Sequence, residues 1–553
     1  MVHMIKVPDF RGGVPPVLLH DLPARAAVLW PDNRALSHDG RHWSYRALQA
    51  AIDAWAQALR GQGLARGARV AVFLDKQFDA VVVSFAVSAA QGVLVPVNPL
   101  LKPAQVAHIL HDCEVWLLVT DRARCQALQA EFSNCPDLRH VVVCGDPGGS
   151  EPGAEPSSPG MPERHESGAW RQRWRAAPIT PARALESDVA AVFYTSGSTG
   201  LPKGVVLSHR NLLVGAVSVV SYLHNKSSDV LLAVLPLTFD AGFSQLTTAF
   251  LVGARVVLQN YLLPRDVLLI MAAERVTGLT AVPPLYAQLL GVAWPAGAAQ
   301  HLRYWANTGG RLPGVVLHGL RERAPAAEPF LMYGLTEAFR STYLPPEEAQ
   351  RRPDSIGKAI PNAEVLVLRE DGSLCADDEP GELVHRGPLV ALGYWNRPQE
   401  TAHRFRPLSG GRSGIAPDVL GPEIAVFSGD QVRRDAEGFL YFVGRRDEMI
   451  KTSGYRVSPT EVEEVALSSG WVREAVALGR PHESLGSVIR LVAWADPEAW
   501  PGREAANTAL QSHFRRQVPA YMVPHEIVWT GQALPRTPNG KFDRRCWSDD
   551  ERL

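Results

Sequence analysis

The sequence predicts an α/β protein with a large N-terminal part, made of two α/β subdomains and a β-rich subdomain, and a small α+β C-terminal domain. Three observations support this prediction. The chain has 553 residues, far more than one hydrophobic core accommodates. Helical stretches alternate with short β-branched runs, which is typical of parallel sheets with crossover helices. After residue 446 a last group of helices and strands, about 100 residues long, is sufficient for a separate domain.

The first α/β subdomain is expected between residue 18 and about residue 146. Its predicted elements are a helix over residues 45–62 and strands over residues 70–74, 93–97, 115–120 and 141–143. The apolar stretch 80–97 approaches the length of a membrane span, but polar residues and a glycine interrupt it. We therefore expect a buried helix followed by a buried strand there, and no integral membrane segment.

The second α/β subdomain begins at Asp188 with the strand AAVFY and continues to about residue 346, and the β-rich subdomain follows over residues 364–440. The C-terminal domain is predicted to contain helices over residues 459–467 and 503–517 and strands over residues 474–477 and 489–495. Two segments rich in glycine and proline are predicted to be surface loops, of which the first is mobile: residues 145–178 and residues 408–422.

Composition excludes several classes of function. The net charge is -1, so no global field attracts nucleic acid or an anionic membrane, and any phosphate binding must be local. The six cysteines are scattered without a CxxC pair, which argues against a zinc site or a disulfide framework. The N-terminus lacks the apolar core of a signal peptide. We expect a cytoplasmic protein.

The most informative segment is 194-YTSGSTGLPKGVVLSHRN-211, in which a buried strand leads into a loop of glycines and hydroxyl residues. Glycines let backbone N–H groups approach an anion, hydroxyl groups add donors, and Lys203 adds positive charge. The spacing does not give GxxxxGK[ST], so the Walker A interpretation fails. The loop is predicted to bind phosphate; by composition alone it is also compatible with a flexible linker.

This string resembles the phosphate-binding signature of the ANL superfamily, which comprises acyl-CoA synthetases, nonribosomal peptide adenylation domains and luciferases. The resemblance implies ATP as substrate. It implies that the nucleotide phosphates are bound by Thr195, Ser196, Gly197, Ser198, Thr199, Gly200 and Lys203. Further motifs follow in the family's order, from about residue 20 to residue 545.

The second motif is 333-YGLTEA-338. The resemblance implies that Tyr333, Gly334 and Thr336 contact the nucleotide and that Glu337 is a ligand of Mg²⁺ bound to ATP. A carboxylate oxygen is the ligand type that Mg²⁺ prefers. A lone glutamate would otherwise be a solvated surface residue.

The third and fourth motifs are 427-FSGDQV-432 and 443-VGRRDEMIKTSGYRVSPTEVEEV-465. Asp430 and Arg445 resemble the ribose-binding pair, and a carboxylate suits the two hydroxyls of a ribose because it only accepts hydrogen bonds. Asp447 resembles the hinge between the two domains, while Lys451 and Gly454 belong to a loop implied to act in thioester formation. On the helix that follows, the glutamates at 461, 463 and 464 are predicted to form a solvated face.

The last motif, 535-PRTPNGKFDRR-545, contains Lys541. The family's catalytic lysine lies here, and its ammonium suits the charge that accumulates when a carboxylate approaches the α-phosphate. The resemblance also implies an adenylation domain over residues 1–446 and a mobile C-terminal domain over residues 447–553. Rotation about Asp447 would exchange Lys541 for the Lys451 loop between the two half-reactions. Thr336, Glu337 and Lys203 complete the implied catalytic set.

The acid pocket is expected from residues 235–250 and 306–313, with Phe239, Asp240, Gly309 and Gly310 lining it. Phe239-Asp240-Ala241 resembles amino-acid-activating domains, in which the matching Asp holds the substrate's ammonium group. A buried carboxylate without a counter-charge is costly, so an Asp240 that points into the pocket implies a cationic or strongly hydrogen-bonding substrate. The alternative is that Asp240 caps a helix starting near Ala241.

The predicted function is an AMP-forming acyl-CoA ligase that uses ATP, Mg²⁺ and coenzyme A. The alternative is a stand-alone adenylation enzyme that loads an amino acid or acyl group onto the phosphopantetheine of a separate carrier protein. A third possibility is a non-catalytic binding protein with the same fold, which loss of Lys541, Glu337 or Asp430 would favour; all three are present. The strings VLVPVNPLLKPAQVAHIL and MYGLTEAFRSTYLPPEE resemble ligases associated with exosortase A and exopolysaccharide gene clusters.

Overall fold

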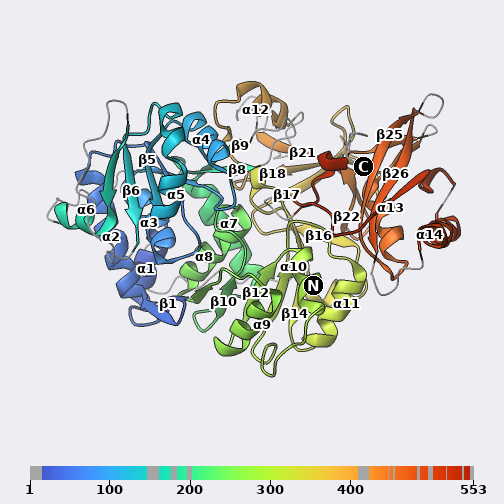
Figure 1. Cartoon of the computed structure of the whole chain (residues 1–553), viewed down its shortest axis with the longest axis horizontal. Helices are drawn as coiled ribbons and strands as arrows, with labels where there is room; N and C mark the ends of the chain where they lie inside the picture. Colours follow the sequence, from blue (N-terminus) through green and yellow to red (C-terminus); the bar gives the residue numbers. More distant parts are fainter. Residues whose placement is uncertain are drawn as a thin grey trace. The chain divides into compact units, whose positions relative to one another are not determined.

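The computed structural model describes residues 15–145, 161–175, 184–195, 202–408, 423–445, 448–452, 455–482, 486–495, 502–518, 520–537 and 541–547. The chain divides into two compact units (Figure 1). The first unit comprises residues 1–351, 359–365 and 385–426, and the second comprises residues 352–358, 366–384 and 427–553. The expected domain boundary at residues 446 and 447 lies outside the described residues and stays a prediction.

One sheet of the first unit has the strand order β19-β9-β8-β4-β3-β5-β6-β7. Its pairs are parallel except at β9, which is antiparallel to both β8 and β19. The strands are β3 (Arg69–Phe73), β4 (Val93–Pro96), β5 (Val115–Asp121), β6 (His140–Cys144), β7 (Glu163–Glu166), β8 (Val189–Thr195), β9 (Lys203–Ser208) and β19 (Gly393–Tyr394). The crossover helices are α3 (Phe78–Ala89), α4 (Pro103–Asp112), α5 (Arg122–Ala127) and α6 (Ser167–Arg173), and α2 (Tyr45–Gly61) leads into β3 from the other sheet.

The second sheet of this unit has the order β15-β14-β13-β12-β10-β11-β1-β2. Its central strands run parallel, and β2 and β15 are antiparallel to their neighbours. The strands are β1 (Arg34–His38), β2 (Arg41–Ser44), β10 (Val230–Ala233), β11 (Arg255–Leu258), β12 (Gly278–Ala281), β13 (Tyr304–Asn307), β14 (Glu328–Tyr333) and β15 (Thr342–Leu344). The helices are α1 (Asp21–Leu29), α7 (His209–Leu223), α8 (Asp240–Val252), α9 (Pro264–Ala273), α10 (Pro283–Leu290) and α11 (Gly314–Arg323).

The expected α/β organisation is confirmed in this unit. The apolar stretch 80–97 forms most of α3 and then β4, and both are buried in the core. Among the described residues, no helix combines the length and the apolar character needed to span a bilayer.

The prediction of a loop over residues 145–178 is wrong for its central part. Residues 163–173 form β7 and α6, and Trp170 is buried against Trp55. The polar composition concealed these elements because β7 is an edge strand whose first two residues face solvent. Residues 146–160 and 176–183 lie outside the described residues, as does most of the predicted insertion at 408–422.

The second unit contains most of β16 (Ser355–Ala359), β17 (Glu364–Leu368), β18 (Gly381–Arg386), β21 (Ile424–Arg434) and β22 (Leu440–Arg445). Its C-terminal part has a sheet of order β24-β23-β26-β25, with β27 paired to β26. These elements are β23 (Ile450–Thr452), β24 (Tyr455–Val457), α13 (Pro459–Leu467), β25 (Val472–His482), β26 (Gly486–Ala495), α14 (Arg503–Gln517) and β27 (Glu526–Thr530). Both helices and the strands of the expected α+β domain are confirmed.

The predicted solvated face of α13 is wrong at Glu463. This side chain is buried, lies 2.6 Å from Arg544 Nη1, and accepts a hydrogen bond from Ala477 N at 2.8 Å. Burial raises the pKa of Glu463, and the guanidinium of Arg544 opposes that effect. Helical periodicity did not predict this burial because it gives no information on a partner 81 residues later in the chain.

Candidate adenylation site

In the first unit, the residues expected at the acid and nucleotide sites follow the carboxyl ends of parallel strands. β10 is followed by the segment with Phe239 and Asp240, β13 by Gly309 and Gly310, and β14 by residues 334–337. Since β10, β12, β13 and β14 are neighbours, these segments emerge along one edge of the sheet. This edge is where open α/β sheets generally bind their ligands.

Glu337 lies in a short 3₁₀ turn after β14 and is largely enclosed. Tyr394 Oη donates a hydrogen bond to its Oε1 at 2.6 Å, and Arg404 Nε lies 3.8 Å from the same oxygen. The backbone is fixed as well, because Ala391 N donates to Glu337 O at 2.8 Å. Burial, and next the charge of Glu337, raise the pKa of Tyr394, so this phenol stays a donor.

Lys203 belongs to the same group of side chains. It forms an ion pair with Glu400, and its Nζ lies 5.8 Å from the centre of the Tyr394 ring. We call Lys203, Glu337, Tyr394, Glu400 and Arg404 the Tyr394 cluster. It brings together the first and second sequence motifs, whose charged residues are 134 positions apart.

Sequence reasoning missed Tyr394, Glu400 and Arg404. They come from β19 and from α12 (Pro398–Arg404), within the segment 393-GYWNRPQET-401 and the three residues after it. A signal was available, because Pro398 occupies the first turn of α12 and is followed by charged side chains.

Several residues predicted for nucleotide binding, the hinge or the thioester step lie outside the described residues, so their predicted roles stay predictions. They are Ser196, Gly197, Ser198, Thr199, Gly200, Asp447 and Gly454; the side chain of Lys451 is likewise not described. Thr195 ends β8 and pairs with Lys203 of β9, which places both ends of the loop on adjacent strands.

The turn after Tyr333 requires a glycine. A Cβ on Gly334 would lie 2.9 Å from Arg340 Cα and 3.1 Å from Phe339 O, both of them backbone atoms. The chain therefore doubles back closely after β14, and Ser341 N donates to Tyr333 O at 3.0 Å. This turn places Thr336, Glu337 and Arg340 in one short segment.

Asp240 does not cap α8, and its expected role in the acid pocket stays a prediction. It is the first residue of α8, so the helix cap falls on Phe239. Its carboxylate is buried and lies 3.1 Å from Arg340 Nη1, and Thr336 Oγ1 donates to it at 3.3 Å. Burial raises the pKa of Asp240, and Arg340 acts in the opposite direction. The Arg340 guanidinium is a counter-charge for the buried Asp240 carboxylate, so burial of Asp240 does not by itself require a cationic substrate.

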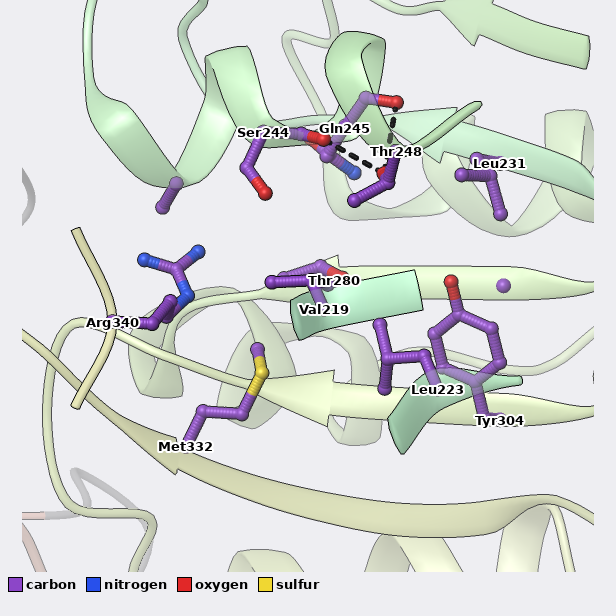
Figure 2. Close-up of a pocket in the computed structure, with 12 residues that line it drawn as sticks. Val219, Leu223, Leu231, Ser244, Gln245, Thr248, Thr280, Tyr304, Met332 and Arg340 are labelled. Atoms are coloured by element: carbon purple, nitrogen blue, oxygen red, sulfur yellow. Dashed lines mark hydrogen bonds between the residues drawn. The ribbon is translucent and has the colours of Figure 1, made fainter. Parts of the chain in front are cut away.

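A small cavity adjoins this ion pair. It lies between α7, α8, β12, β13 and β14, and its free volume is about 10 Å³. Ser244, Gln245 and Thr248 line it from α8, and Met332 and Arg340 line it from β14 and the following turn (Figure 2). Phe239, Asp240, Gly309 and Gly310 are not among the lining residues, and both glycines are exposed.

In the second unit, Asp430 of β21 and Arg445 of β22 form a cross-strand pair. Arg445 Nε lies 3.6 Å from Asp430 Oδ1, and Asp430 N donates to Ser428 Oγ at 3.0 Å. The structure thus brings together the two residues expected at the ribose. Lys541 is exposed, and its carbonyl accepts a hydrogen bond from Thr537 N at 2.7 Å.

Glu337 fits a Mg²⁺ ion that is bound mainly by ATP. The described residues contain one group of three side chains that could hold a metal among themselves, His140, Glu163 and His165 on β6 and β7, and Glu337 is not part of it. Glu337 is therefore suited to supply a single carboxylate, with phosphate oxygens and water completing the coordination, as is usual for Mg²⁺ in nucleotide sites.

The fold and the clustered motif residues together define an adenylate-forming enzyme. Two family models match the chain, one described as AMP-binding enzyme over residues 23–395 and one as AMP-binding enzyme C-terminal domain over residues 461–541. The chain belongs to the AMP-binding enzyme family, as the sequence motifs indicate.

Curated relatives fall into two groups. The long-chain-fatty-acid–CoA ligase of Salmonella typhimurium is 28% identical and is matched over 97% of this chain and 94% of its own. A linear gramicidin synthase of Brevibacillus parabrevis is also 28% identical, over 97% of this chain but only 10% of the synthase. The phosphinothricin tripeptide synthetase PhsC of Streptomyces viridochromogenes is 31% identical over 96% of this chain and 45% of the synthetase.

Solved structures share the fold. The o-succinylbenzoate CoA synthetase of Bacillus subtilis, in complex with its acyl-adenylate, matches with a TM-score of 0.79 and 25% identity over 96% of this chain and 98% of its own. The benzoate CoA ligase of Burkholderia xenovorans matches with a TM-score of 0.81 and 23% identity over 96% and 100%. The narrower resemblance to exosortase-associated ligases stays a prediction.

Proposed function

We propose that this chain activates a carboxylic acid with ATP to give an acyl-AMP and pyrophosphate, and then transfers the acyl group to the thiol of coenzyme A. The observation that supports this most is the Tyr394 cluster, which joins Lys203 at the start of β9 in one sheet to Glu337 after the carboxyl end of β14 in the other. Thr336 donates a hydrogen bond to Asp240, whose ion-pair partner Arg340 lines the adjoining cavity. A cation, a carboxylate and an enclosed cavity are the elements that coupling ATP to a small acid requires.

In the first half-reaction, a carboxylate oxygen of the acid attacks the α-phosphorus and the bond to pyrophosphate breaks. Little proton chemistry is involved, so positioning and neutralisation of charge carry the catalysis. Mg²⁺, when bound, neutralises charge on the phosphate oxygens. We assign Lys203 and residues 196–200 to binding of the β- and γ-phosphates, and Glu337 to binding of the metal. We assign Asp430 and Arg445 to the ribose and Lys541 to the reacting carboxylate.

In the second half-reaction, the thiol sulfur attacks the acyl carbonyl carbon, its proton is released to solvent, and AMP leaves. We propose that Lys541 has withdrawn by then and that the loop with Lys451 and Gly454 accompanies the pantetheine chain, by rotation about Asp447. Removal of Lys541 should therefore separate the two steps.

A second candidate is a stand-alone adenylation enzyme that loads a carrier protein. It is favoured by the similarity to gramicidin and phosphinothricin synthetases. The Asp240–Arg340 pair counts against an amino acid as the substrate, because Arg340 already neutralises the carboxylate that would meet an ammonium group.

ATP–pyrophosphate exchange on the purified chain tests the proposal. Fatty, aryl and amino acids are supplied in turn, and the best acid is then offered coenzyme A or a phosphopantetheinylated carrier protein. We expect exchange with at least one acid and thioester formation with coenzyme A. Exchange followed by transfer only to the carrier favours the second candidate, and no exchange with any acid contradicts both.

A further inference from the structure

Arg340 is positioned by an unusual backbone conformation. The preceding residue, Phe339, has φ 59° and ψ -66°, and Arg340 N donates to Ala338 O at 2.7 Å, which closes a γ-turn. Positive φ is unfavourable for a bulky side chain and persists only where surrounding packing enforces it. The Phe339 ring supplies that packing, because it fills the space beside Gly215, where a Cβ would lie 2.4 Å from Cε1 of the ring.

The guanidinium that this turn presents is enclosed, and the hydroxyl of Tyr222 is one of its hydrogen-bond partners. Its Nη1 lies 3.1 Å from Asp240 Oδ2 and 3.2 Å from Phe339 O. Its Nε is buried and has no hydrogen-bond partner within the described part of the chain. Figure 2 shows the Arg340 side chain at one end of the cavity, directed toward the helix that carries Ser244 and Gln245.

A second residue that lines the cavity, Gln245, also has a buried polar atom without a hydrogen-bond partner in the described chain. Gln245 Nε2 donates to Leu232 O at 3.0 Å, but Gln245 Oε1 is buried without a partner in the described chain. Buried polar atoms are nearly always hydrogen-bonded in folded proteins, so one unpaired donor and one unpaired acceptor at the same cavity indicate a missing polar group. A hydroxyl group both accepts and donates hydrogen bonds, so it suits a cavity that has an unpaired donor and an unpaired acceptor.

The size of the cavity restricts the size of the acid that can carry this polar group. A free volume of about 10 Å³ accommodates about one water molecule. An extended alkyl chain would need extensive rearrangement of α8 and β14, and it would leave the polar lining unsatisfied. A compact acid also exceeds this volume, but by less than an alkyl chain does, and its polar substituent can pair with the polar atoms of the lining.

We propose that the acid activated by this chain is compact and carries a second, uncharged oxygen, as a hydroxyl or keto group, that accepts a hydrogen bond from Arg340 Nε. This inference rests on the proposed function. The ion pair explains why the oxygen is uncharged. A substrate ammonium would face the Arg340 cation, and a second carboxylate would face Asp240, whereas a neutral oxygen meets no like charge.

Matched acids test this on the unmodified protein by pyrophosphate exchange. The pairs are butanoate with 3-hydroxybutanoate and 3-oxobutanoate, and benzoate with 2-hydroxybenzoate; succinate, 3-aminobutanoate and decanoate complete the set. We expect kcat/KM for the best oxygenated acid to exceed that of its unsubstituted partner by about 10²-fold, because a site built for a hydroxyl group rejects the analogue that lacks it. Equal or better use of the unsubstituted, charged or long-chain acids overturns the inference and leaves the proposed function intact, whereas no exchange with any acid overturns both.

Arg340→Lys separates the charge of Arg340 from its Nε–H donor, because lysine keeps the positive charge beside Asp240 but has no Nε. We expect KM for the oxygenated acid to rise about tenfold or more, with little change for the unsubstituted partner, so that the selectivity ratio falls. A merely structural role would reduce both acids equally, and that result would contradict the inference. His318→Asn, at an exposed position on α11, is the matched control and should leave the ratio unchanged.

Discussion

Two ion pairs in the first unit differ in how they are built, although each brings together residues that are at least 100 positions apart in the sequence. Lys203 and Glu400, on the nucleotide side, have side chains 17% and 36% exposed. Arg340 and Asp240, on the acid side, are 3% and 13% exposed, and a γ-turn and a hydrogen bond from Thr336 hold them in place. We therefore expect that the Lys203 ammonium can exchange its carboxylate partner for a phosphate, and that the Arg340 guanidinium stays paired with Asp240.

The difference indicates how recognition is divided between the two sides. A phosphate group brings its own charge, so an accessible lysine that releases a glutamate is sufficient to bind it. An acid substituent without charge is recognised only by donors and acceptors that are already fixed in place. We therefore expect substitutions on the nucleotide side to impair catalysis, and substitutions on the acid side to change stability and selectivity.

The largest effect is expected at Lys541, which we assign to the nucleotide chemistry. Lys541→Ala should reduce pyrophosphate exchange by about 10³-fold, because the charge developing between carboxylate and α-phosphate loses its cation. Thioester formation from supplied acyl-AMP should change by less than about threefold, since that step does not form this charge. The two half-reactions are measured separately on the same preparation. Equal losses in both would contradict the assignment.

The free energy of unfolding of variants tests whether the two ion pairs differ in this way. Arg340→Met leaves the Asp240 carboxylate buried without its ion-pair partner and should lower the free energy of unfolding by about 3 kcal/mol. Lys203→Met, at the more accessible pair, should lower it by less than about 1 kcal/mol. Urea denaturation followed by tryptophan fluorescence measures both. The double variant Asp240→Leu, Arg340→Met should recover much of the loss; equal effects of the two single variants would remove the distinction between the pairs.

Much of the fold and of the nucleotide side could be predicted from the sequence. Helices such as α13 and α14 begin and end where periodicity, Pro459 and flanking glycines indicate. Local motifs singled out Lys203, Glu337, Asp430 and Arg445, and the structure places Lys203 with Glu337 and Asp430 with Arg445, while their roles at phosphate, metal and ribose stay predictions. Their partners Tyr394 and Glu400 were missed because an ion pair across 197 positions leaves no local pattern.

The acid side could not be predicted for a different reason. The motif singled out Asp240, but the charge environment of its carboxylate depends on Arg340, 100 positions later. The φ angle of Phe339 sets the orientation of the Arg340 side chain. An arginine after a YGLTEA motif gives no indication of whether it faces solvent or a cavity. Backbone strain of this kind follows from packing against Gly215, which is a property of the assembled fold.

At Glu337 the expected effect is on the Mg²⁺ dependence of the reaction. Glu337→Gln keeps the acceptor for Tyr394 but removes the charge, and exchange should fall by about 10²-fold at limiting Mg²⁺ and recover partly as Mg²⁺ rises. Tyr394→Phe, the matched control, retains the carboxylate and should show the same Mg²⁺ requirement as the unmodified protein. Loss of activity in Glu337→Gln that no concentration of Mg²⁺ relieves would contradict a role in metal binding.

The smallest effect is expected at His385, whose Nδ1 lies 2.9 Å from the Oγ of Ser341, next to Arg340. Burial lowers the pKa of His385 from 6.5 to about 4. Between these values the unfolded chain binds a proton that the folded chain does not, so stability falls as the pH drops through this range. From pH 7 to pH 5 the loss should be about 2 kcal/mol.

His385→Asn keeps an acceptor near Ser341 and removes the titration, so the pH dependence of the unfolding free energy should become shallower by that amount. His318→Asn on the exposed face of α11 should leave the dependence unchanged. Urea denaturation at pH 7, 6 and 5 provides the comparison. If His385→Asn retained the full slope, the acid sensitivity would come from other groups and not from this buried imidazole beside the acid side.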